Sequence, residues 1–152
     1  MAHPMSQDEV LAFLQSDPPH TAVVSTVRAD GRPHVAPVWF ALDTSTAGAD
    51  NPLGDIVFNT GEDTVKGRTL RRDPRVALCI QDERPPHAFL TIDGVATLSE
   101  EPDELFRWAS LLGGRYLGAD RAEELGRRNG VPGELLVRVR PRQVVGLAEL
   151  AD

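Results

Sequence analysis

The sequence contains almost no cysteine and no long hydrophobic run, and each shortage excludes a class of protein. Cys79 is the only cysteine among 152 residues, so no disulfide can form within the chain. It lies in the apolar run VALCI, where a buried, unreactive thiol is expected. No apolar run approaches the ~20 residues of a membrane-spanning helix. The first residues, MAHPMSQDEV, lack the basic-then-apolar pattern of a secretion signal. We therefore expect one cytoplasmic domain over residues 1–152, with no membrane partner.

The sequence also lacks the motifs of metalloproteins, hydrolases and nucleotide-binding proteins. The four histidines, His3, His20, His34 and His87, are scattered, and no two have metal-ligand spacing. No G-x-S-x-G, Walker or G-x-G-x-x-G pattern is present. The formal charge of -7 argues against non-specific binding to nucleic acid. We therefore expect no metal site, no nucleic-acid partner and no nucleophilic catalysis.

What the sequence does contain is a series of short strand-like segments joined by turns. Asp30-Gly31 is a hairpin signal between the first two segments. Asp93-Gly94 marks a bulge or bend within the fifth, and Pro141 ends or bends the last. The polar segment from Asp43 to Gly54 is predicted to be a loop. The six expected strands cover residues 21–27, 34–42, 55–60, 75–82, 88–100 and part of 134–150.

Helical patterns lie between some of these strands. Ser6 and Glu9 form a capping-box pattern before the first apolar helical face. A short helix within 64–74 stops at Pro74, and further helices are expected in 101–112 and 119–130. The helix in 101–112 has one apolar face, made by Leu105, Trp108, Ala109 and Leu112. Strands joined by hairpins, with helices inserted, predict a mainly β fold: an antiparallel barrel of six strands with flanking helices.

Positive charge is concentrated in one segment of this acidic chain. The segment TVKGRTLRRDPRV, residues 64–76, places five basic residues within ten positions: Lys66, Arg68, Arg71, Arg72 and Arg75. One interpretation is a solvated helix whose arginines pair with nearby acids. Arg71, Arg72 and Arg75 suit it, because cations are favoured near a helix C-terminus.

The other interpretation of this segment is a phosphate site. Asn59 and Thr60 end a predicted strand, and a helix with Lys66 and Arg68 in its first turns follows. Backbone N–H groups, the helix dipole and a lysine can converge on an anion at such a position. The sequence by itself leaves both interpretations open.

The strand HVAPVWFAL, residues 34–42, is apolar on both faces. Pro37 lies in its middle and cannot donate a hydrogen bond to a neighbouring strand. Ala36 and Val38 share one face, and Pro37 and Trp39 share the other. The strand is therefore either a bulged edge beside a flat ligand or a barrel strand packed on both sides.

Together these segments resemble a known family. The order DGRPHVAPVWFALD, IVFNTGEDTVKGRTLRRDPRVAL and FLTIDGVATL is similar to the flavin- and deazaflavin-dependent oxidoreductases related to pyridoxamine 5′-phosphate oxidase, which have a split β-barrel. The resemblance covers roughly residues 8–147. Its most specific part is T-x5-K-x-R-x-L-x-x-D-P-R, from Thr60 to Arg75, and the LRRDPR run is most similar to the branch that binds coenzyme F-420.

The resemblance implies a homodimer with two cofactor sites at the subunit interface. In it, Lys66 matches the lysine that holds the cofactor phosphate. Thr64 stands where the family often has a second cation, so phosphate binding is expected to depend more on Lys66 and Arg68. The remaining implied contacts are Asn59 and Thr60 beside the phosphate, Ala36, Pro37 and Val38 along the ring, and His87 and Phe89 from the partner strand.

The resemblance also implies the chemistry. A reduced coenzyme F-420 would donate hydride to a small, conjugated organic substrate, so the protein is expected to be an F-420-dependent oxidoreductase. His34, His87 and Tyr116 are possible proton donors, and solvent would also suffice. The alternatives are an FMN-dependent oxidase or reductase on the same barrel and a non-catalytic cofactor-binding protein.

Overall fold

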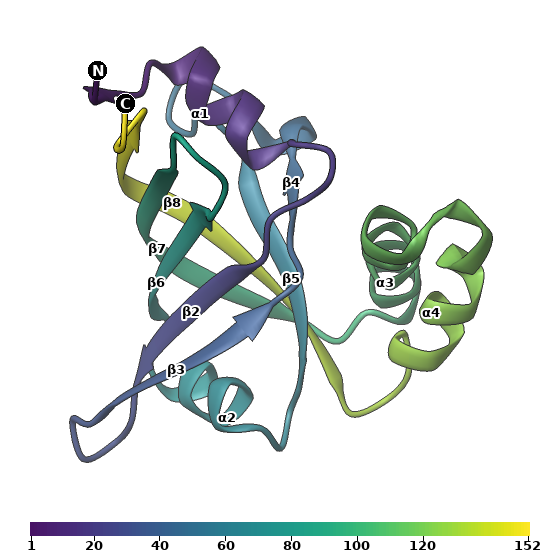
Figure 1. Ribbon diagram of the computed structural model, residues 1–152. Helices are drawn as coiled ribbons and strands as arrows, with labels where there is room; N and C mark the ends of the chain where they lie inside the picture. The colour runs from purple at the N-terminus through teal and green to yellow at the C-terminus, as the bar shows by residue number, and fades with distance from the viewer.

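The computed structural model describes residues 1–152, and its centre is an eight-stranded antiparallel sheet that curls without closing (Figure 1). Four helices flank it: α1 (Gln7–Leu14), α2 (Val65–Arg72), α3 (Pro102–Leu117) and α4 (Ala122–Asn129). Short 3-10 turns cover Thr44–Thr46 and Ala119–Arg121. The strands are β1 (His3–Pro4), β2 (Ala22–Val27), β3 (Pro33–Val38), β4 (Ala41–Asp43), β5 (Asp55–Gly61), β6 (Arg75–Asp82), β7 (Ala88–Ser99) and β8 (Glu134–Ala148). None of the helices is both long enough and apolar enough to span a membrane.

The predicted mainly β, antiparallel fold with flanking helices is confirmed, but the predicted count of six strands is wrong. The two additional strands have separate origins. The expected strand 34–42 divides into β3 and β4, and β1 pairs with the end of β8, where His3 lies opposite Ala148. The pairing of β1 with β8 brings the two chain ends together (Figure 1).

The division of the strand at Trp39 and Phe40 explains why the sheet curls. The strand order is β3-β2-β6-β7-β8-β5-β4, so β3 and β4 lie at opposite edges of the sheet. Only Trp39 and Phe40 join them along the chain, which forces the two edges to approach each other. We call these two residues the seam. Because β3 is an edge strand, Pro37 can lie within it at little cost in hydrogen bonding.

A tyrosine on α3 satisfies the backbone at the seam. The N–H of Phe40 donates to the Tyr116 hydroxyl at 3.2 Å, and that hydroxyl donates to the carbonyl of His20 at 2.6 Å. Unpaired backbone groups are costly when they are buried. Tyr116 therefore replaces a missing neighbouring strand and ties α3 to both the seam and the segment before β2.

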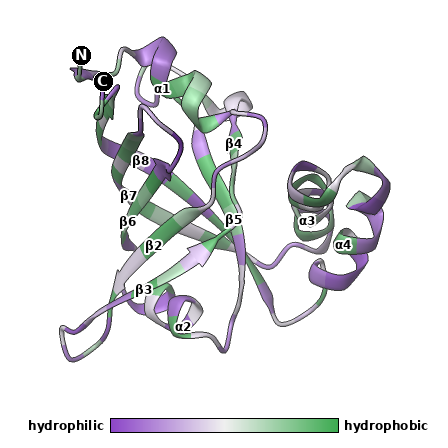
Figure 2. Ribbon diagram, in the orientation of Figure 1, coloured by the Kyte–Doolittle hydropathy of each residue, from purple (hydrophilic) through white to green (hydrophobic).

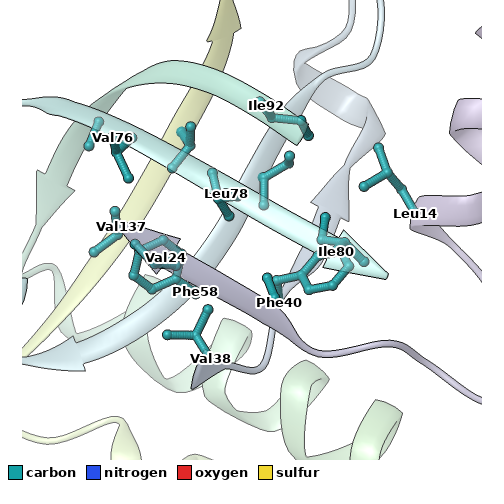
Figure 3. Packing of buried hydrophobic residues seen from close by; sticks show 14 of the residues in the cluster. Leu14, Val24, Val38, Phe40, Phe58, Val76, Leu78, Ile80, Ile92 and Val137 are labelled. Atoms are coloured by element: carbon teal, nitrogen blue, oxygen red, sulfur yellow. The ribbon is translucent and has the colours of Figure 1, made fainter. Parts of the chain in front are cut away.

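The interior of the curled sheet is one hydrophobic core (Figure 3). Phe40, Phe58 and Ile80 are fully buried there, and Leu14 of α1 covers one end. Along the ribbon, hydrophobic residues concentrate in the strands, whereas α4 is largely hydrophilic (Figure 2). The capping box of Ser6 and Glu9 at the start of α1 is present as predicted.

The helix α3 packs on the outside of the sheet through a second, smaller cluster. Its predicted apolar face is confirmed, because Leu105, Trp108, Ala109 and Leu112 are all buried. They pack beside β4, β5 and β8, and this places the α3–α4 pair next to the seam (Figure 1).

Two further expectations can be compared with the structure. The register of β7 against β8 shifts between Asp93 and Gly94, which confirms the predicted bulge. A Cβ on Gly94 would lie 2.6 Å from Val139 Cγ1, so only glycine fits there. Pro141 lies opposite this bulge, and β8 continues beyond it. The expectation of a buried thiol at Cys79 is wrong: the side chain is half-buried and lies on the outer face of the sheet.

Candidate functional site

A cavity of about 290 Å³ opens where the seam, the start of α2 and the α3–α4 pair meet. One side comes from β3 and the seam, a second from the end of β5 with α2, and a third from α3 and α4. The lining residues are Pro37, Val38, Trp39, Asn59, Thr60, Gly61, Lys66, Ala109, Leu112, Gly113, Leu125, Asn129 and Glu134. The cavity thus has an apolar half and a polar half.

The polar half is built at the turn from β5 into α2. The buried Thr60 hydroxyl lies 2.9 Å from the hydroxyl of Thr64, which bonds the Gly61 carbonyl at 2.8 Å. Thr64 also caps α2 by accepting from the N–H of Gly67 at 3.0 Å. A Cβ on Gly67 would lie 2.3 Å from the Gly61 carbonyl, so glycine lets the helix rest against the strand end. The other first-turn N–H groups have no partner within the helix.

Lys66 is the only cation that lines this cavity. Its half-buried side chain makes no ion pair or hydrogen bond within the chain. Arg68, two residues on, is exposed and lies outside the lining. A lysine without a partner beside a helix start is a site suited to an anion.

The other arginines of the basic segment have structural partners. Arg71 pairs with Glu62 and with Glu100, at 3.4 and 3.2 Å. Arg75 pairs with Asp73 at 2.7 Å and, with its backbone, lowers the pKa of Asp73 to about 2. Arg72 donates to the Val27 carbonyl and so fastens α2 to β2. The solvated-helix interpretation therefore describes Arg71 and Arg75, whereas Lys66 lies in a different environment.

The apolar half of the cavity is built on the seam. Trp39, 38% exposed, stacks on Tyr116 with ring centroids 5.0 Å apart and planes at 4°. Burial raises the pKa of Tyr116, and its hydroxyl is committed to the backbone of His20 and Phe40. Tyr116, which the sequence offers as a proton donor, is thus placed as the support that holds Trp39 in position.

Sequence reasoning missed the third side of the cavity. Ala109, Leu112 and Gly113 of α3, with Leu125 and Asn129 of α4, line it only because this helix pair packs beside the seam. No local motif marks them. Glu134, the first residue of β8, was missed too, although it lies directly opposite Gly61 in the sheet. Burial, and then the charge of Asp63, raises the pKa of Glu134.

The structure brings together five of the nine residues predicted to bind cofactor. Pro37, Val38, Asn59, Thr60 and Lys66 line the cavity. Ala36 is half-buried on β3 but does not line it, and Arg68 lies outside it.

The remaining two, His87 and Phe89, line a separate hollow with Cys79, Gln81 and Leu150. His34, the other candidate proton donor, is also outside the cavity, and its buried Nδ1 has no hydrogen-bond partner.

The cavity and this hollow lie along one exposed sheet surface. Aligned across β3, β2, β6, β7 and β8 are Pro37, Val23, Cys79, Thr91 and Val145. These five residues and Val35 define what we call the outer face. Val35 is 62% exposed, Val145 46% and Val23 44%, so apolar side chains are open to solvent across several strands. Patches of this kind usually mark interaction surfaces.

Comparison with solved structures places the fold among known proteins. The conserved hypothetical protein Rv2991 from Mycobacterium tuberculosis is 26% identical, with a TM-score of 0.78 over 95% of this chain and 86% of that one. An F420 reductase is 24% identical, with a TM-score of 0.64 over 88% and 93% of the two chains. The heme storage protein HutZ from Vibrio cholerae is 22% identical, with a TM-score of 0.64 over 91% and 92%. A search of curated proteins found no match.

The family assignment rests on the sequence itself. The model of the pyridoxamine 5′-phosphate oxidase family matches residues 6–147, which is nearly the whole chain. The family is named for an oxidase, and the F420 reductase shares its fold. The resemblance seen in the strand order and the basic segment is thereby confirmed, and this chain belongs to the pyridoxamine 5′-phosphate oxidase family.

Proposed function

We propose that this protein is a coenzyme F-420-dependent oxidoreductase that transfers hydride between the deazaflavin and a small, conjugated organic substrate. The observation that carries the proposal is the two-part cavity. An unpaired Lys66 at a helix start provides an anion site, and Trp39 with Pro37 provides an apolar surface for a flat ring. A ligand with a phosphate at one end and an aromatic system at the other matches this division.

The residues of this chain would act by binding and positioning. Lys66 and the first turn of α2 hold the phosphate, while the backbone of β3 and the seam border the ring. When bound, reduced F-420 supplies a hydride from a ring carbon at the position where flavins have nitrogen. Leu112 of α3 and Leu125 of α4 limit access of water to the apolar half. With Tyr116 committed to the backbone, we assign the proton to solvent.

We further propose that the protein acts as a homodimer with the outer face at its interface. Near the C-terminus, the sequence offers Val144, Val145 and Leu147 to cover a partner. Val145 lies on the outer face, and Leu147, opposite Phe89, lies on the same side of the sheet two positions further along β8. Val144 instead packs against the core. In a dimer of this kind, the partner's hollow with His87 and Phe89 would come close to the cavity. This explains why residues that the family resemblance groups together lie in two separate places in one chain.

The dimer makes a direct prediction about mass. Light scattering at low micromolar concentration is expected to give twice the chain mass of 16.5 kDa. Val145→Glu would place a charge in the apolar interface, so we expect it to produce a monomer with weakened cofactor binding. Val131→Glu is the control, since Val131 is 38% exposed in the turn before β8, outside both cavity and outer face. A stable monomer with full cofactor affinity would contradict the proposed interface.

A second prediction concerns the cofactor. In parallel titrations of the apo-protein followed by absorbance and fluorescence, we expect tighter binding of coenzyme F-420 than of FMN. The basic segment and the family branch to which it is most similar support this preference. Purification of a yellow protein with stoichiometric FMN, or tighter binding of FMN in solution, would favour the alternative of an FMN-dependent oxidase or reductase.

A non-catalytic cofactor-binding protein is the remaining alternative, and the structural similarity to a heme storage protein keeps it relevant. Turnover distinguishes it from an enzyme. Under anaerobic conditions, reduced F-420 should be oxidised by a panel of quinones and conjugated enones only when the protein is present. Tight F-420 binding without any turnover across such a panel would support the carrier.

A further inference from the structure

The polar half of the cavity carries two opposite charges. Lys66 lines it from α2 and Glu134 lines it from the start of β8, and no arginine lines it. The carboxylate of Glu134 accepts no hydrogen bond and makes no ion pair, so no cation within the chain neutralises it. Asn59 and Asn129 contribute only neutral amides. The lining residues thus contribute no net charge when Glu134 is ionised.

This arrangement is unusual for a site that has to hold a phosphate dianion. A phosphate monoester carries nearly two negative charges above neutral pH, whereas a phosphodiester carries one. Coulomb repulsion from a fixed carboxylate is proportional to the ligand's charge, and it is stronger in a partly buried site than in bulk water. The negative field at this end of the cavity is reinforced by Asp63, whose charge acts on Glu134.

We propose that Glu134 is a specificity-determining residue, which makes the cavity prefer a phosphodiester monoanion over a phosphate monoester dianion. The inference rests on the proposed function, in that the cavity is taken as the cofactor phosphate site. Coenzyme F-420 carries its phosphate as a diester and FMN carries a monoester, so the selection acts between these two cofactors. Lys66 supplies the attraction that both share, and Glu134 opposes the more highly charged ligand.

Three flavins with the same ring and different phosphate charges test the proposal. Riboflavin carries no phosphate, riboflavin 4′,5′-cyclic phosphate carries a diester with one charge, and FMN carries a monoester with nearly two at pH 8. Dissociation constants are measured by fluorescence quenching for the natural protein, Glu134→Gln and Glu101→Gln. Glu101 is the matched control, since it is exposed before α3 and makes no side-chain capping bond.

The expected result is a graded gain in Glu134→Gln. FMN should bind about tenfold more tightly and the cyclic diester about threefold, because the lost repulsion scales with ligand charge. Riboflavin should change less than about twofold, and Glu101→Gln should alter none of the three. Unchanged FMN affinity in Glu134→Gln, or an equal gain for all three flavins, would overturn the proposal.

Failure of the proposed function would give a different pattern. If Glu134→Gln shows the graded gain for the three flavins but the protein never turns over F-420, the proposed charge selection is supported and the proposed enzymatic role is rejected. If no flavin binds, the same variants are compared with inorganic phosphate and dimethyl phosphate at pH 8, followed through the Gly61 amide by NMR. A larger tightening of inorganic phosphate than of dimethyl phosphate in Glu134→Gln would support the selection, and no change or an equal gain for both would reject it.

Discussion

Lys66→Ala is expected to weaken binding of the cofactor by about 10- to 150-fold. The reason is the loss of one charge-assisted hydrogen bond, worth roughly 1.5–3 kcal/mol. Lys66 is the only cation that lines the cavity, so no neighbouring side chain can take over its role. The fold should tolerate the change, because the Lys66 side chain has no partner within the chain. Fluorescence titration, with the melting temperature of the apo-protein measured alongside, gives both quantities.

Arg68→Ala is the matched control for this prediction. Arg68 is on the same helix, carries the same charge and is exposed outside the cavity, so its loss should cost under about threefold in affinity. It is a better control than Arg72, whose guanidinium donates to the Val27 carbonyl and contributes to the packing of α2. Equal, small losses at Lys66 and Arg68 would show that the basic segment is only a solvated helix surface.

Arg138→Met is expected to destabilise the fold by about 2–4 kcal/mol. The Arg138 guanidinium donates to Asp43 at 2.8 Å and to Glu104 of α3 at 3.3 Å. Asp43 is 7% exposed, so removing the cation leaves a buried carboxylate with only Ser45 as a partner. Arg138 also lies 5.4 Å from the centre of the Trp108 ring, and methionine retains part of that packing.

Urea denaturation measures this loss, and Arg140→Met is the control. Arg140 lies two residues along β8, is exposed, and donates only to the Asp50 carbonyl at 3.2 Å. Its substitution should change the free energy of unfolding by less than about 0.5 kcal/mol. Equal losses for the two variants would mean that the Arg138 network contributes no more than an ordinary surface arginine.

The pH dependence of the Arg138→Met effect provides a further check on its cause. Burial by itself would raise the pKa of Asp43, but hydrogen bonds from Ser45 and Arg138, with the Arg138 charge, lower it below its ordinary 3.8. A carboxyl whose pKa is lower in the folded state adds stability above its unfolded pKa, and that stability is lost as pH falls through the folded pKa. Without Arg138 the folded pKa of Asp43 is lowered less, so the variant loses less of this stability in acid than the natural protein does. The difference between the two proteins should therefore be constant from pH 7 to about pH 4 and shrink as pH falls further.

Most of the secondary structure and five of the thirteen residues that line the cavity could be read from the sequence, because local signals specify them. The capping box at Ser6, the bulge at Gly94 and the apolar face of α3 each depend on neighbours within a few residues. The grouping of strand end, helix cap and lysine at the proposed anion site was also predictable, since all three lie within eight positions. The structure then showed that Lys66 lines the cavity and Arg68 does not, because the two residues lie on different sides of the helix α2. The sequence pattern does not distinguish them.

Tertiary structure decided the rest, because it depends on contacts between residues far apart in the sequence. Nothing local indicates that the segment 34–42 breaks at Trp39, since the break follows from pairing β3 with β2 and β4 with β5 at opposite sheet edges. Glu134 reaches the cavity through its pairing with Gly61, seventy-three positions earlier. The sequence by itself therefore determined the family, most of the helices and strands, and the position of the lysine after the strand end. Only the curling of the sheet and the packing of α3 beside the seam decided that a carboxylate lines the same cavity as that lysine, since long-range pairing sets which side chains share a cavity.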